Sequence, residues 1–169
     1  EVLYDHILDF LSPPRRAAED VYRKGRKAAI SEVADKAHDS SNRNISSKEG
    51  EISRPSVQSI DVSTGEVELV NTQGPVKLRL TITSASKPLE VHVQPVDSID
   101  DGLLWEPCLI DGHCGVRINT SQPYYSKVYV PNIAQGVTIK GLNALPWGIS
   151  AAELNCLSDL NNSFFGELR

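Results

Sequence analysis

The stretch Leu103–Pro131, LLWEPCLIDGHCGVRINTSQPYYSKVYVP, decides the fold of this chain. Residues 103–110 and 115–119 have the apolar composition of two strands, and Asp111-Gly112 between them favours a two-residue hairpin turn. Pro107 has no backbone donor, so we expect its strand at a sheet edge or a bulge. The polar residues 119–122 and Pro123 then end the pairing. This stretch therefore predicts a hairpin that a turn connects to a final helical region.

Further strands precede this hairpin. Residues 76–83, VKLRLTIT, alternate strictly, so the even-numbered apolar side chains should face a core and the odd-numbered polar ones should face away. Residues 57–62 and 66–70 flank Ser63-Thr64-Gly65 and predict a second hairpin. A shorter alternation, LEVHV at 89–93, predicts one more strand. The middle of the chain is thus expected to form a mainly antiparallel sheet.

Helical patterns flank the predicted sheet. Residues 2–11 and 15–39 have helical apolar spacing and predict an N-terminal arm, whereas residues 40–55 are rich in Ser, Asn and charge and predict a linker or mobile loop. Residues 144–160 predict a C-terminal helix on the sheet. The expected fold class is α+β, divided into an arm (1–39), a linker (40–55), a β-rich domain (56–142) and a C-terminal helix with its tail (143–169).

Composition bounds the function. The chain has 169 residues, 40% of them hydrophobic, and a formal net charge of −5, which argues against a surface that binds phosphate backbones as a whole. Its three cysteines are an odd, irregularly spaced set and favour a reducing compartment. No apolar run approaches the roughly 18 to 20 residues that span a bilayer, so we expect a cytoplasmic protein. The absence of Met, with helical residues at the start, suggests a fragment of a longer protein.

Cys108, His113 and Cys114 are the residues that most resemble a metal site, because thiolate and imidazole are preferred zinc ligands. A fourth ligand would have to come from the distant His92 or Cys156, so these residues are weak candidates and we predict no metal site. A nucleophile–base pair of Cys114 and His113 is equally weak, because adjacent strand residues point to opposite faces. The sequence assigns no catalytic residue and no cofactor to this chain.

The arm is net positive, with seven basic and four acidic residues between Arg15 and Lys36. A solvated helix face with (i, i+4) ion pairs explains this charge more simply than nucleic-acid contact. If nucleic acid binds, the contacts would come from the basic cluster Arg23, Lys24, Arg26 and Lys27.

One pattern resembles a known family. Val116–Asn119, then Gln122–Tyr125 and Lys127–Tyr129, resemble a segment of bacterial GHKL-superfamily ATP-binding proteins, the gyrase, MutL and histidine-kinase group. There, a strand ending in Asn precedes a His-Pro-Phe-Tyr-like turn and a helix, well downstream of the ATPase module. Residues 151–155, AAELN, resemble the family's C-terminal helix, and the charged arm resembles its layout. In this chain Gln122 stands in place of the His and Tyr124 in place of the Phe.

The resemblance implies a C-terminal domain whose nucleotide site lies elsewhere, so ATP and Mg²⁺ are expected only with an upstream ATPase module. The domain would be a non-catalytic interaction or dimerisation domain that couples this module to a partner, either a second copy or another protein. Asn119, Pro123, Tyr124 and Tyr125 would form a structural turn. The expected interface residues are Trp147, Leu154, Phe164 and Phe165.

Two other functions remain open. An independent β-rich module could bind peptide or carbohydrate on exposed rings of Trp105, Tyr124, Tyr125 and Tyr129. A hydrolase could use Cys114 or an acidic set made up of Asp97, Asp100, Asp101 and Asp111.

Overall fold

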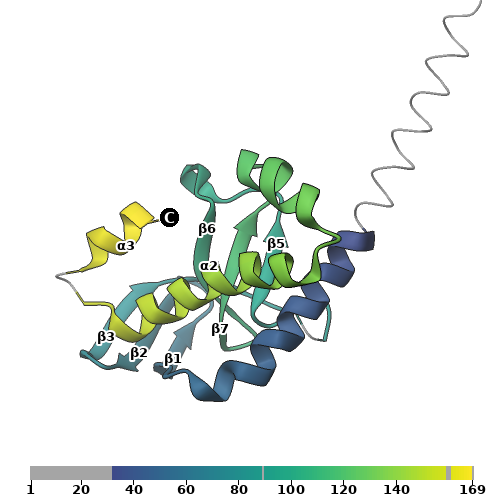
Figure 1. Ribbon diagram of the computed structural model, residues 1–169. Coiled ribbons are helices and arrows are strands. Elements are labelled where there is room, and N and C mark those ends of the chain that lie inside the picture. Colours follow the sequence, from purple (N-terminus) through teal and green to yellow (C-terminus); the bar gives the residue numbers. More distant parts are fainter. Residues whose placement is uncertain (1–31, 89, 159–160, 169) are drawn as a thin grey trace, which may run out of the picture. The chain divides into compact units, whose positions relative to one another are not determined.

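The computed structural model describes residues 32–88, 90–158 and 161–168 (Figure 1). The chain divides into two units, residues 1–35 and 36–169, and both sheets belong to the second unit. The predicted helix at 2–11, most of the predicted arm and the basic cluster at 23–27 lie outside the described residues. The α+β class is confirmed, with helices beside one antiparallel and one mixed sheet.

The antiparallel sheet has three strands in the order β1-β2-β3: β1 (Ser56–Asp61), β2 (Glu66–Asn71) and β3 (Gly74–Arg79). The predicted hairpin at 57–70 is present, and Gly65 in its turn has a φ of 72°, which glycine adopts without strain. On the outer face, Glu66 lies opposite Arg79 and Glu68 opposite Lys77, so cross-strand pairs balance the charges there.

The mixed sheet has the order β4-β6-β7-β5, formed by β4 (Thr81–Thr83), β6 (Trp105–Ile110), β7 (His113–Asn119) and β5 (Val93–Val96). β6 and β7 form the predicted antiparallel hairpin, whereas β4 runs parallel to β6 and β5 parallel to β7. Asp111 and Gly112 in the hairpin turn both have positive φ, 48° and 79°, as the sequence signal predicts.

The alternation at 76–83 connects the two sheets. β3 and β4 are separated only by Leu80, which is buried, while Lys77 and Arg79 are exposed as predicted. The chain therefore passes from one sheet to the other with its apolar side chains on the same side. A core cluster spans both sheets and the C-terminal helix, made up of Val67, Leu69, Leu80, Leu109, Cys114 and Leu154.

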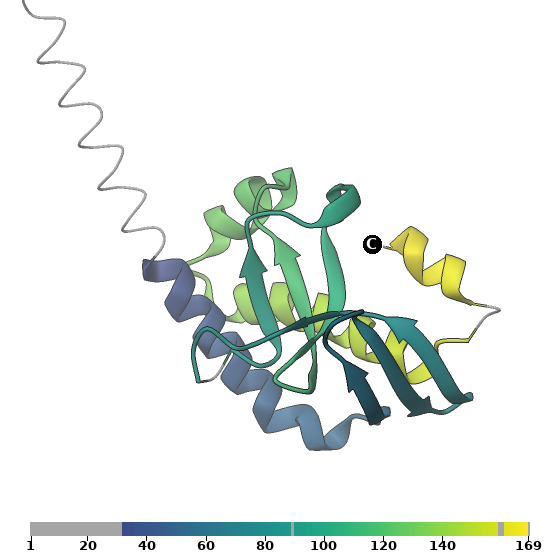
Figure 2. The same cartoon turned by 180° about the vertical axis from the view of Figure 1, so that it is seen from behind.

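Helices cover one face of the mixed sheet. Residues 36–48 of the second unit are helical and lead into the short turn η1 (Glu49–Glu51), and α2 (Gly136–Cys156) runs along the sheet (Figures 1 and 2). The Trp147 indole N–H donates to the Cys114 carbonyl at 3.3 Å and so fixes α2 to β7. Smaller helical turns are η2 (Asp100–Gly102), η3 (Tyr125–Tyr129), η4 (Val130–Asn132) and α3 (Asn162–Leu168).

Four local expectations need correction. Residues 40–48 are helix and not a linker, with Asn42 and Ile45 buried. The C-terminal helix begins at Gly136, inside the region expected to be β-rich. The strand expected at 89–93 begins only at Val93. Pro107 lies in the central strand β6. It is tolerated there because β4 pairs only with the residues from Cys108 onward, so β4 needs no hydrogen bond from the Pro107 nitrogen.

Candidate functional site

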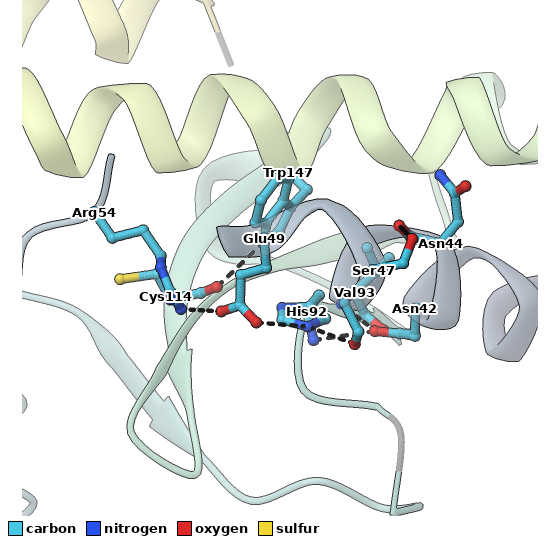
Figure 3. Close-up of polar contacts among 10 residues, drawn as sticks. Asn42, Asn44, Ser47, Glu49, Arg54, His92, Val93, Cys114 and Trp147 are labelled. Carbon is cyan, nitrogen blue, oxygen red and sulfur yellow. Dashed lines mark hydrogen bonds and ion pairs between the residues drawn. The ribbon is translucent and has the colours of Figure 1, made fainter. Parts of the chain in front are cut away.

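A polar cluster joins the helix at 36–48 to the beginning of β5 (Figure 3). The Asn42 Oδ1 accepts hydrogen bonds from the His92 and Val93 amides, each at 3.0 Å. Its Nδ2 donates to the Val93 carbonyl and to the His38 carbonyl of its own helix, each at 3.1 Å. Asn42 thus caps the outer edge of β5, which would otherwise present unpaired backbone groups. We call Asn42, Ser46, Glu49 and His92 the His92 clasp.

The His92 ring is the centre of the clasp, with a side chain only 1% exposed. Its Nε2 lies 3.0 Å from the Ser46 hydroxyl oxygen and 3.6 Å from Glu49 Oε2. Glu49 is also paired with Arg54, so its negative charge is already partly balanced. The His92 Nδ1 is buried and has no hydrogen-bond partner among the described residues. Burial lowers the pKa of His92, Glu49 raises it, and His113 and Arg54 lower it further.

This geometry differs from a catalytic triad. In a triad the nucleophile and the carboxylate bind opposite nitrogens of the imidazole, so that the ring relays a proton. Here Ser46 and Glu49 both approach Nε2 of His92. The arrangement therefore orients the ring and holds the helix against the sheet, and it lacks the opposite-nitrogen geometry of a triad.

A second network lies where the predicted turn meets the two helices. The Asn143 Nδ2 donates to the Ser41 and Tyr129 hydroxyls at 2.8 and 2.9 Å. The Tyr129 hydroxyl lies 3.3 Å from His38 Nδ1, and the Tyr125 hydroxyl 3.4 Å from His38 Nε2. Because Tyr129 accepts from Asn143, its proton is available to His38 Nδ1.

The π-helical turn η3 makes this network possible. Its wide turn closes with a bond from the Val130 amide to the Tyr125 carbonyl, so residues four apart lie almost one above the other. The rings of Tyr125 and Tyr129 stack at 4.8 Å between centroids, and His38 stacks on Tyr129 at 5.0 Å. Burial raises the pKa of the Tyr129 phenol, which keeps it protonated.

The predicted turn residues lie at this junction. The Asn119 Oδ1 accepts from the Ser121 amide at 3.1 Å, and its Nδ2 donates to the Leu103 carbonyl at 2.9 Å. Asn119 therefore makes the local backbone bond that its position predicts. Pro123 begins the helical segment that leads through Tyr124 into η3, where its missing N–H is not required.

The cysteine candidates do not converge. Cys108 lies opposite Gly115 in the β6–β7 register and Cys114 opposite Leu109, so the two thiols are on opposite faces of the sheet. Burial raises the pKa of Cys108 to about 12 and that of Cys114 to about 11, which opposes thiolate chemistry. Among the described residues, no group of three or more His, Cys, Asp or Glu side chains is placed to hold a metal ion.

Other predicted positions also have packing roles. Tyr129 is fully buried, and Trp105 and Tyr125 pack against the core, so these rings do not form the exposed stacking surface of a carbohydrate-binding module. Asp111 accepts from the Ala85 amide at 3.1 Å and holds the loop after β4. A pocket of about 430 Å³ opens beside the clasp. Its lining is Ile52, Arg54, Pro55, Ser56, Val57, Gly112, His113 and Cys114.

Two of the four predicted interface residues are core residues. Trp147 is 4% exposed and Leu154 is fully buried, because the inward face of α2 packs on both sheets. This corrects the expectation of an exposed interface at these positions. Phe164 is 58% exposed, and its ring meets Phe165 edge to face at 5.5 Å within α3.

The outward face of α2 carries apolar side chains that the sequence analysis did not single out. Val137 is 89% exposed and Leu145, two turns later, is 63% exposed. Gly141 lies between them and is also exposed. Only Lys140 and Glu153 are charged in this 21-residue helix, so the face has little charge to keep it solvated. We call Val137, Gly141 and Leu145 the outer α2 stripe.

Comparison of the chain with protein-family models, with curated proteins and with solved structures gave no match. In the part of the chain that the structure describes, no helix is both long and apolar enough to cross a bilayer.

Sequence reasoning missed the residues of the clasp for two reasons. Asn42 and Glu49 lie in the stretch that its Ser and Asn content marked as a linker, and His92 was considered only as a remote metal ligand. A signal was nevertheless present. His38, Ser41 and Ile45 continue the helical spacing of the arm, and all three are buried.

Proposed function

We propose that this chain is a non-catalytic interaction domain that pairs with a second copy of itself through the outer α2 stripe. The observation that carries the proposal is the exposure of Val137 and Leu145, on a helix with only two charged residues. Exposed apolar side chains gathered on one helix face are costly in water and are typical of surfaces that a partner covers. Gly141 between them leaves space for a close approach.

The wider context of the proposal is a C-terminal domain of a GHKL-type ATP-binding protein. The strand ending at Asn119 and the turn at 122–125 support it, as residues that resemble that family. In this proposal the ATPase module lies upstream, and this domain couples the nucleotide state to pairing. The upstream reading frame is a direct test, because the absence of an ATPase module there would contradict this context.

Sedimentation velocity over a range of protein concentrations tests the pairing. We expect the native chain to show a dimer, and Val137→Lys and Leu145→Lys each to raise its dissociation constant at least about tenfold, as for an anchor residue of an interface. Val62→Lys is the matched control, since Val62 is 74% exposed but lies in the β1–β2 turn. A native chain that stays monomeric at its highest soluble concentration, or equal effects of all three variants, would contradict the proposal.

A further inference from the structure

The His92 clasp combines features that couple its closure to a proton. All of its hydrogen bonds between helix and sheet end on two adjacent residues, His92 and Val93. One ring nitrogen of His92 faces Ser46 and Glu49, and the other is buried without a partner among the described residues. A proton on the second nitrogen, Nδ1, would therefore have no hydrogen-bond acceptor and almost no contact with water.

The groups around the ring determine which charge state it holds. Glu49 from η1 presents a carboxylate, but Arg54 already binds it. His113 from β7 meets the His92 ring edge to face at 6.5 Å between centroids. Trp147 from α2 meets it edge to face at 5.8 Å and brings no charge. One carboxylate shared with an arginine is thus the only negative group that the structure places beside this ring among the described residues.

The neutral ring fits this environment with its hydrogen on Nε2. Glu49 can only accept a hydrogen bond when ionised, and the Ser46 hydroxyl can accept as well as donate. An Nε2–H of His92 therefore has acceptors in Glu49 and Ser46. The unprotonated Nδ1 carries no hydrogen and so requires no acceptor. Protonation adds a hydrogen at Nδ1 and a charge at a site that is 1% exposed. Release of the ring to water hydrates the charge and gives the Nδ1 hydrogen an acceptor.

We propose that the His92 clasp is a pH-sensitive latch, which holds the helix at 36–48 on β5 at neutral pH and releases it when His92 becomes protonated. Release uncovers the His92 and Val93 amides that Asn42 now covers, while the pairing of β5 with β7 remains. This device goes beyond the proposed pairing, because it lies on a different element from the outer α2 stripe.

The sign of the effect follows from linkage. Burial lowers the pKa of His92 in the closed state below the ordinary value of 6.5. The closed state is therefore most favoured above about pH 6.5. It loses stability relative to the open state by about tenfold per pH unit from that value down to the lowered pKa of the closed state. Between pH 7.5 and pH 5 the loss is therefore at most about 30-fold.

Amide hydrogen exchange of the full chain, followed by NMR and corrected for intrinsic rates, tests the latch. We expect the protection factors of the His92 and Val93 amides to fall from pH 7.5 to pH 5, by up to about 30-fold. The Ile118 amide in β7 should keep its protection. Equal loss at Ile118 would mean general unfolding and would overturn the proposal, as would unchanged protection at His92 and Val93.

Two variants assign the effect to the ring. His92→Gln has no titrating group and should abolish the pH dependence, whereas His113→Gln, at the neighbouring exposed histidine, should retain it. If His92→Gln does not fold, ¹⁵N shifts of the His92 ring in the native chain decide the matter. They should show an Nε2–H ring at pH 7.5 and a protonated ring only together with the loss of amide protection. Protonation of His92 with the amides still protected would overturn the proposal.

Discussion

Asn42 pairs with Val93 as a neighbouring strand would. Its Oδ1 accepts from the Val93 amide at 3.0 Å and its Nδ2 donates to the Val93 carbonyl at 3.1 Å. A single side chain thus satisfies both backbone groups at a sheet edge, and it does so from a helix. The consequence is that the helix at 36–48 and β5 depend on one another.

We expect Asn42→Ala to destabilise the chain by about 2–3 kcal/mol, because it leaves buried backbone groups of His92 and Val93 without partners. The free energy of unfolding in urea measures this effect. Asn44→Ala is the matched control, since Asn44 lies on the same helix and its side chain makes none of these bonds. Alanine favours a helix more than asparagine does, so Asn44→Ala should not destabilise the chain, and equal losses in the two variants would contradict the edge cap.

The sequence predicted secondary structure best where the spacing of apolar residues fits only one kind of element. The alternation at 76–83 and the Asp111-Gly112 turn gave strands and a hairpin that the structure contains. Both signals are local, because a strand's faces and a two-residue turn are determined by neighbouring residues. The parallel pairing of β4 with β6 and of β5 with β7 was not predicted, since it depends on residues far apart in the chain.

The candidate site could not be predicted, for a different reason. Ser41 and Asn42 are polar, and polar residues in a row predict solvent exposure. In the structure they are buried, because each finds a bonding partner on another element. Trp147 and Leu154 show the opposite error, since a large apolar residue fits an interface or a core equally well until the sheet beneath it is known.

Tyr129→Phe should lower the free energy of unfolding by about 1–3 kcal/mol, because Asn143 and His38 both lose the buried hydroxyl that they contact. Tyr125→Phe is the control, because its hydroxyl makes a longer contact to His38, at 3.4 Å, and its ring is less buried. We expect thermal unfolding to show a clearly lower Tm for Tyr129→Phe, and a larger loss in Tyr125→Phe would contradict the network.

Two glycine substitutions should have opposite signs. A Cβ on Gly115 would lie 2.7 Å from Ile110 Cδ1 and 3.2 Å from the His92 carbonyl oxygen, so Gly115→Ala should destabilise the chain by about 1–3 kcal/mol. A Cβ on Gly141 would meet nothing within 4 Å among the described residues of this chain, so Gly141→Ala should stabilise the monomer by up to about 1 kcal/mol. Chemical denaturation of both variants compares them directly. Equal signs would contradict this packing.

The reactivity of the three thiols should reveal which cysteines are buried on the sheet. Burial raises the pKa of Cys108 to about 12 and that of Cys114 to about 11, from an ordinary value of 9.0, so both remain thiols at pH 8. Only thiolate attacks a disulfide reagent, and a pKa two units higher lowers the thiolate fraction about a hundredfold. Cys156 is partly exposed. We therefore expect one fast thiol in the native chain and three in urea, with Cys156→Ser removing the fast one. Rapid native labelling of Cys108 or Cys114, located by mass spectrometry, would show that β6 and β7 open more readily than their burial implies.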